Sequence, residues 1–182
     1  MRKIKLNKAT LLYYYVKLVK EKGSPEYIAK GWALGIFVGM VVPIGFQMLI
    51  AIPLAFAIKG SKIGATVGTF ITNHFTIIIV YPIQCWVGGY ILGSPLSIVK
   101  IKNELGTLFK EPTFHSLFSL GGELIATFFV GGFFFAVIGT PITYFLVKWL
   151  VIEHRKKAQI RKLRKAQKLK DKKDLKKQEL DQ

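Results

Sequence analysis

Three long stretches without a charged side chain constrain this chain more than any other feature of its sequence. Residues 31–58, 63–99 and 124–147 contain no Lys, Arg, Asp or Glu. Each stretch is longer than the roughly 20 apolar residues that an α-helix needs to cross about 30 Å of hydrocarbon. Helices that are apolar all round belong in a membrane or in the core of a large protein, and this chain has only 182 residues. The sequence therefore predicts an all-α, polytopic helical membrane protein.

The basic residues lie mainly at the two ends of the chain. The net charge is +17 although the mean hydropathy is +0.37. Residues 1–30 hold eight Lys and Arg and residues 148–182 hold fourteen, which leaves five for the middle. Because Lys and Arg concentrate on the cytoplasmic side of membranes, we expect both ends to face the cytoplasm. This predicts a multi-pass protein of the inner (cytoplasmic) membrane with an even number of full crossings.

The charge pattern divides the chain into three predicted parts. Residues 1–23 are expected to form a basic amphipathic helix at the membrane interface. Residues 24–150 are the predicted membrane domain, which includes a second interfacial helix over residues 98–109. Residues 151–182 are predicted to be a cytoplasmic basic tail, solvated and partly helical. Both basic ends favour lipids with anionic headgroups, whereas nucleic acid is not an expected partner because the tail has no aromatic residue to stack on bases.

The first two uncharged stretches are predicted to be interrupted helices. Pro43 has no amide hydrogen and disfavours helical geometry at the residue before it, and Gly45 follows closely. In the second stretch, polar residues interrupt the apolar pattern: Thr72, Asn73, His74 and Thr76. We expect the first stretch to be re-entrant around Pro43, the second to cross the membrane with a break near Asn73, and residues 124–147 to cross back as a clean span.

A weak internal repeat supports two matched interruptions. Gly35 and Phe37 precede the first break as Gly68 and Phe70 precede the second, at an offset of 33 residues. Paired interrupted helices in two halves are the sequence pattern that indicates a central binding site in transporters built from repeats.

The polar residues at the breaks allow two interpretations. Backbone groups freed at a break cannot face lipid, so Asn73 and Thr76 are expected to cap them. Alternatively, these side chains line a shared polar pocket between the two interrupted helices, because polar groups at membrane depth often mark a pathway. The residues of this predicted pocket are Gln47, Asn73, His74 and Thr76, and those of the breaks are Gly35, Pro43, Gly45 and Gly68. We expect Gln84 and Cys85 to be packing residues.

The same region does not favour an enzyme. Residues 31–99 contain no Asp or Glu, and an enzyme needs a nucleophile with its base, a carboxylate pair or a metal site. No group of His and Cys reaches the number and spacing of metal ligands. We therefore expect neither catalytic residues nor a cofactor.

Residues at both breaks resemble a known family. The segments "SPEYIAKGWALGIFVGMVVPIGFQ", "GTFITNHFT" and "YPIQCWVGGYILG" are similar to the bacterial membrane family called domain of unknown function 2062. The resemblance covers about residues 8–150 and implies a helical membrane fold, but no activity. The chain departs from the family pattern at three places: Gly45 stands one residue early, Ser61 and Lys62 stand where an asparagine usually precedes the second segment, and His74 replaces a proline. The matching positions are Ser24, Pro25, Ile28, Ala29, Gly31, Ala33, Gly35, Phe37, Pro43, Gln47, Gly68, Thr69, Ile71, Thr72, Asn73 and Thr76.

Two functional classes follow from these observations. The broken helices favour a transporter or lipid translocator with a polar site between them. The alternative is a membrane scaffold or accessory subunit that recruits anionic lipid or a partner through its basic tail. A second copy of the chain and another membrane protein are both candidate partners.

Overall fold

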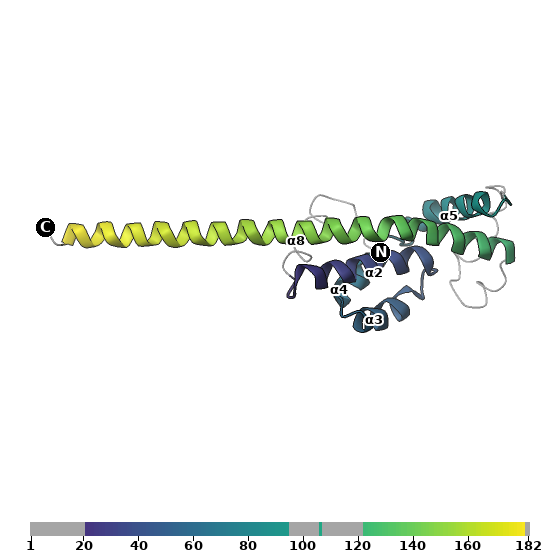
Figure 1. Cartoon of the computed structure of the whole chain (residues 1–182), viewed down its shortest axis with the longest axis horizontal. Helices are drawn as coiled ribbons and strands as arrows, with labels where there is room; N and C mark the ends of the chain where they lie inside the picture. Colours follow the sequence, from purple (N-terminus) through teal and green to yellow (C-terminus); the bar gives the residue numbers. More distant parts are fainter. Residues whose placement is uncertain (1–20, 95–105, 107–121, 181–182) are drawn as a thin grey trace. The chain divides into compact units, whose positions relative to one another are not determined.

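The chain is all-α over the residues that its structure, a computed structural model, describes. These are residues 21–94, 106 and 122–180, with side chains up to residue 168. They include five helices (Figure 1): α2 (Pro25–Val41), α3 (Gln47–Ala57), α4 (Lys62–Thr69), α5 (Ile77–Ile91) and α8 (Gly122–Leu180). The predicted interfacial helices over residues 1–23 and 98–109 lie almost entirely outside the described residues.

The chain divides into two compact units. Residues 23–148 form one unit, which holds α2 to α5 and the first part of α8. Residues up to 22 and residues 149–182 form the other. Within this second unit, the guanidinium of Arg155 donates a hydrogen bond to the carbonyl of Glu21 at 3.0 Å. Lys157 and Glu153 form an ion pair at 3.4 Å along one face of α8.

Two serines begin the helices that carry the breaks. The Ser24 hydroxyl accepts a hydrogen bond from the amide of Tyr27 at 3.1 Å, and Pro25 occupies the first turn of α2. Ser61 caps α4 in the same way, since its hydroxyl accepts from the amide of Gly64 at 2.7 Å. Each predicted interruption then falls between two helices, at residues 42–46 and 70–76.

Helices α2 and α4 lie side by side (Figure 1) and approach each other through glycines. A Cβ added to Gly35 would lie 2.7 Å from the Cα of Gly68, and one added to Gly68 would lie 2.8 Å from the carbonyl oxygen of Trp32. These separations are shorter than real carbon contacts. The two helix backbones can therefore pack this closely only because both positions lack a side chain.

Helix α3 runs back beside the same pair of helices. The hydrogen bond from the amide of Ser61 to the carbonyl of Tyr27, at 2.9 Å, brings the end of α3 back to the start of α2. Only Gln47, Ala51 and Ala55 of α3 are buried, at spacings of four residues that define one face. The remaining surface of α3 is apolar and exposed, with Leu49 69% accessible.

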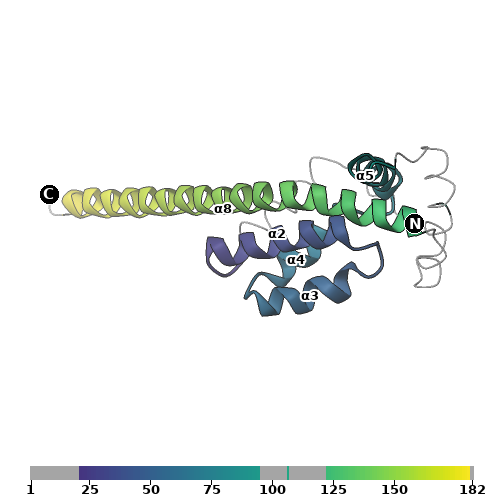
Figure 2. The ribbon, with the colours of Figure 1, turned by 45° about the vertical axis from the view of Figure 1, so that its right-hand side comes forward.

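Helix α5 packs against the first part of α8 (Figure 2). A Cβ on Gly88 would meet the backbone of Thr127, and one on Gly131 would meet the backbone of Gln84, so these glycines allow close contact. The two helices run in opposite directions, because the Ser94 hydroxyl at the end of α5 is hydrogen-bonded to Glu123 at the start of α8. Their shared core contains Ile77, Tyr81, Cys85, Leu124 and Phe128.

Among the described residues, one helix is long and apolar enough to cross a membrane. It covers Gly122–Lys168 and includes the predicted clean span of residues 124–147. Helix α8 passes through Pro141 without ending, and it continues to Leu180, so the part of the tail that the structure describes is helical. Helices α3 and α5 are also apolar but shorter, at 11 and 15 residues.

Candidate functional site

The first break begins where proline prevents α2 from continuing. Val42 has an extended backbone, with φ −100° and ψ 131°, because the ring of Pro43 excludes helical geometry at the preceding residue. Gly45 has a φ of +98°, which a residue with a side chain rarely adopts, so this glycine permits the turn into α3. The last carbonyls of α2 lose their helical partners at this point. They are left to be satisfied by side chains from elsewhere.

Gln47 supplies hydrogen bonds to these carbonyls. It is the first residue of α3 and only 5% exposed. Its side-chain nitrogen lies 2.9 Å from the carbonyl oxygen of Val42 and 3.1 Å from that of Gly39. The side chain of α3 therefore caps the end of α2 from across the turn.

Thr72 brings the second break to the same carbonyl. Thr72 is 2% exposed, and its hydroxyl donates to the carbonyl of Gly39 at 2.8 Å and accepts from the side-chain nitrogen of Gln47 at 2.7 Å. We call this cluster of Gly39, Val42, Gln47 and Thr72 the break junction. At the break junction, the two interruptions of the chain share one set of hydrogen bonds.

Asn73 and Thr76 stabilise the second break locally. The side-chain oxygen of Asn73 accepts from the amides of Phe75 at 2.9 Å and Thr76 at 3.1 Å. The Thr76 hydroxyl accepts from the amide of Asn73 at 2.8 Å and donates to the carbonyl of Ile71 at 2.8 Å. This reciprocal pattern resembles a capping box and satisfies backbone groups between α4 and α5.

Helix α5 contacts the first break from its other side. The hydroxyl of Tyr81 accepts a hydrogen bond from the amide of Ile44 at 2.7 Å. The side-chain nitrogen of Gln84 donates to the carbonyl of Met40 at 3.0 Å. Gln84 is fully buried, and its side-chain oxygen has no hydrogen-bond partner in the part of the chain that the structure describes. This buried, unpartnered acceptor lies beside the end of α2 and can accept a hydrogen bond from a further donor.

The structure distributes the four predicted pocket residues over three environments. Gln47 belongs to the break junction, whereas Asn73 and Thr76 bond to each other and to neighbouring backbone. His74 is exposed. Thr72 and Gln84 are buried polar residues near the breaks. Neither of them is among the residues of the predicted polar pocket. Thr72 was already visible as a polar residue within an uncharged stretch, but nothing in its spacing distinguished it from its neighbours.

The chemistry available here is that of neutral hydrogen-bonding groups. Amide and hydroxyl side chains can bind polar atoms, but they do not exchange protons as catalytic acids or bases near neutral pH. Over residues 21–94, 106 and 122–180, no three His, Cys, Asp or Glu side chains gather as a metal site requires. The break junction therefore satisfies the backbone groups of the two interruptions with neutral side chains.

Comparison with known proteins identifies a family for most of the chain. The model of a bacterial family described as an uncharacterized protein conserved in bacteria (DUF2062) matches residues 8–159. This match confirms the resemblance inferred from the segments around the two breaks. No curated protein and no solved structure matches the chain.

Proposed function

The chain belongs to the uncharacterised bacterial family DUF2062, and from this premise we propose that it is a multi-pass membrane protein that moves lipid across the bilayer. In this proposal α2 and α3 form a re-entrant hairpin, α4 and α5 together make one broken crossing, and α8 crosses back. The observation that carries the proposal is that both breaks meet at one set of polar groups, the break junction.

The exposed surfaces of the helices support the membrane placement. Large apolar side chains are exposed along α3, α5 and α8, including Leu49 at 69%, Ile79 at 64% and Phe145 at 68%. Monomeric soluble proteins rarely expose contiguous apolar patches of more than a few hundred Å². Lipid tails would cover these side chains without cost.

The positions of the charged residues indicate how deep the first break lies in the proposed membrane. Lys148 and Glu26 form an ion pair at 2.9 Å, and Gly132 packs against the carbonyl of Met40. These two contacts are separated by 16 residues along α8 and 14 along α2, or about 20–25 Å at 1.5 Å per residue. The hydrocarbon core is about 30 Å thick. With the ion pair at the surface, the first break therefore lies inside the hydrocarbon.

The same contacts support an orientation. We call the unit formed by residues 23–148 the membrane unit. The ion pair of Glu26 with Lys148 and the hydrogen bond from the amide of Ser61 to the carbonyl of Tyr27 lie at one end of it. Four lysines belong to this end, and Glu123 begins α8 at the opposite end. Because lysine is enriched on the cytoplasmic side, this end faces the cytoplasm. The four residues are Lys30, Lys59, Lys62 and Lys148.

Polar groups at this depth give the proposal its mechanism. A lipid headgroup that enters hydrocarbon without partners loses its hydrogen bonds to water, at a cost of several kcal/mol. The side-chain oxygen of Gln84, which has no partner among the described residues, is the acceptor that we assign to the headgroup's hydrogen-bond donors beside the first break. Lipid is favoured over a polar solute because six of the nine residues that line the pocket near α2 and α8 are apolar.

Reconstitution into vesicles tests this function. Purified protein in vesicles that contain fluorescently labelled phosphatidylglycerol should make the inner-leaflet label accessible to an impermeant reductant. Gln84→Leu should slow this exchange, whereas Ile83→Ala, a change at the exposed neighbouring residue, should not. Thermal unfolding of each variant shows whether slower exchange results from loss of the hydrogen-bond acceptor or from loss of the folded structure. Exchange no faster than in protein-free vesicles would reject lipid translocation.

A specific observation also favours the scaffold alternative. Helix α8 continues from its apolar part to Leu180 without interruption, and its exposed residues over 155–168 include seven Lys and Arg. Such a segment attracts anionic membranes or an acidic partner by charge. Deletion of residues 153–182 distinguishes the two functions. A translocator should keep its activity in vesicles, whereas a scaffold should lose its partner while the membrane unit remains folded.

A further inference from the structure

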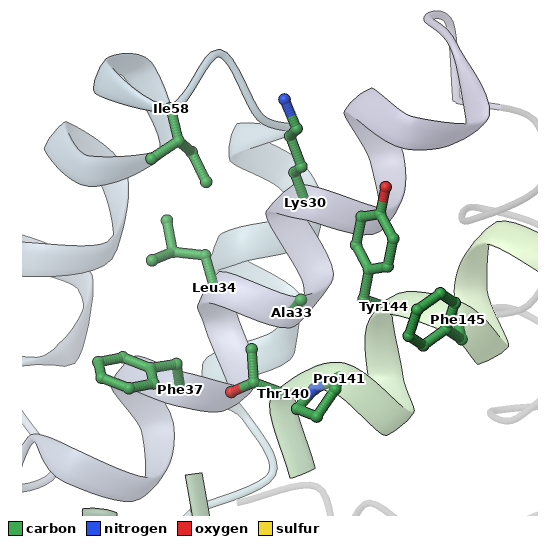
Figure 3. A pocket seen from close by; sticks show the side chains of 9 residues that line it. All are labelled: Lys30, Ala33, Leu34, Phe37, Ile58, Thr140, Pro141, Tyr144 and Phe145. Atoms are coloured by element: carbon green, nitrogen blue, oxygen red, sulfur yellow. The ribbon is translucent and has the colours of Figure 1, made fainter. Parts of the chain in front are cut away.

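An apolar groove lies on the membrane unit between α2, the end of α3 and α8. Its volume is about 430 Å³, within the range of about 300–1,000 Å³ typical of small-molecule sites. Leu34 and Phe37 of α2 form one wall, Ile58 lies at the end of α3, and Phe145 belongs to α8 (Figure 3). The walls carry no acidic side chain, so the groove is suited to a hydrocarbon chain.

One end of this groove is polar and positively charged. Figure 3 shows the amino group of Lys30 and the hydroxyl of Tyr144 pointing in the same direction, away from Phe37. Lys30 is exposed and forms no ion pair with any residue that the structure describes. Glu26, one turn earlier on α2, forms its ion pair with Lys148 and is only weakly attracted by Lys30, which is the smallest cause of its lowered pKa. The free ammonium group of Lys30 is therefore available to an anion at the groove end.

We propose that this groove binds one anionic glycerophospholipid, with an acyl chain along Leu34 and Phe37 and the phosphate at Lys30. Lys30 lies one helical turn from Glu26, so it stands at the level that the proposed membrane placement assigns to the cytoplasmic surface. The inference rests on that placement, and it names the lipid class that the proposed translocation would handle. The phosphate accepts hydrogen bonds from both the ammonium of Lys30 and the hydroxyl of Tyr144.

In this proposal, the site selects among lipids by their headgroups and not by their acyl chains. An acyl chain that leaves the bilayer for an apolar groove exchanges one apolar surrounding for another, so no hydrophobic driving force favours the transfer. Attraction of an anionic headgroup to a basic residue near the surface changes binding about fivefold, equivalent to about 1 kcal/mol. The groove therefore determines where a chain lies, and Lys30 determines which lipid is held.

Lipid titration of the detergent-solubilised full chain tests the proposal. Native mass spectrometry should detect one retained phosphatidylglycerol, and phosphatidylcholine with the same acyl chains should bind more weakly. Lys30→Glu should lower the affinity for phosphatidylglycerol at least fivefold and leave phosphatidylcholine unchanged. Leu34→Trp should fill the groove and reduce binding of both lipids.

Two matched variants control for charge and for size. Lys162→Glu makes the same charge change on the exposed tail helix, and Leu146→Trp places the same ring on an exposed part of α8. Both should bind lipid as the wild type does. Unchanged lipid preference in Lys30→Glu would overturn the proposal. A Leu34→Trp variant that keeps its lipid but no longer self-associates would also overturn it, because a second copy of the chain would then be the occupant of the groove. Retained lipid without exchange in vesicles would reject translocation alone, and extraction of the protein without detergent would reject the membrane placement.

Discussion

The side-chain nitrogen of Gln47 lies 2.7 Å from the hydroxyl of Thr72, and these residues belong to two helix breaks that are 25 residues apart in sequence. Both side chains also reach the carbonyl of Gly39 at the end of α2. The relationship means that neither break is satisfied by its own segment alone. The α2–α3 pair and the α4–α5 pair therefore depend on each other at their interrupted points.

Removing the amide of Gln47 should destabilise the protein. Gln47→Leu retains the size of the side chain but leaves the carbonyls of Gly39 and Val42 without their buried donor, at a cost of about 1–3 kcal/mol. Thr72→Val should cost less, about 0.5–1.5 kcal/mol, because valine has nearly the shape of threonine and the change removes a single hydroxyl. The free energies of unfolding of both single variants and of the double variant give the coupling between them. Purely additive effects would contradict a shared hydrogen-bonded cluster.

The closest approach of α2 and α4 gives a second prediction. Alanine normally stabilises a helix interior relative to glycine by up to about 1 kcal/mol. Gly35→Ala should instead destabilise by about 1–3 kcal/mol, because the added carbon would overlap the backbone of Gly68. Gly122→Ala is the matched control, since nothing lies within 4 Å of a Cβ at that position. The midpoints of thermal unfolding of the two variants in detergent should shift in opposite directions or by clearly different amounts.

The second break predicts different roles for two adjacent residues. Asn73→Ala removes the acceptor used by two backbone amides and should cost about 1 kcal/mol, as loss of a helix cap does. His74→Ala should change stability by less than about 0.5 kcal/mol, because His74 is exposed. Lipid exchange in vesicles should be unaffected by either change once folding is matched. Loss of exchange in folded Asn73→Ala would assign this side chain to the pathway instead.

Topology can be measured with single cysteines. In a Cys85→Ala background, cysteine at Ser24 or Gln178 should resist an impermeant thiol reagent applied to intact cells, because the concentration of Lys and Arg near both ends of the chain predicts that each end faces the cytoplasm. Cysteine at Gly122, which is exposed at the start of α8, should react. Labelling of Ser24 from outside, or equal labelling of all three positions, would exclude the proposed arrangement.

Part of this architecture could be predicted from the chain alone. The uncharged stretch of residues 124–147 predicted an apolar span, and α8 contains it. Pro43 and the polar group around Asn73 predicted two interruptions, which fall between α2 and α3 and between α4 and α5. The capping interpretation of Asn73 and Thr76 also required only local information, because their hydrogen bonds reach no further than five residues along the chain.

The sequence by itself determined the local properties: which segments are apolar, where proline or polar residues stop a helix, and where the charge lies. Only the tertiary structure decided which breaks meet, because the bonds from Thr72 to Gly39 and from Gln84 to Met40 join residues 33 and 44 positions apart. Such pairs depend on how closely α2, α4 and α5 approach. The separation of α2 and α4 is set by facing glycines on the two helices, and a linear pattern contains no record of which glycines will face each other.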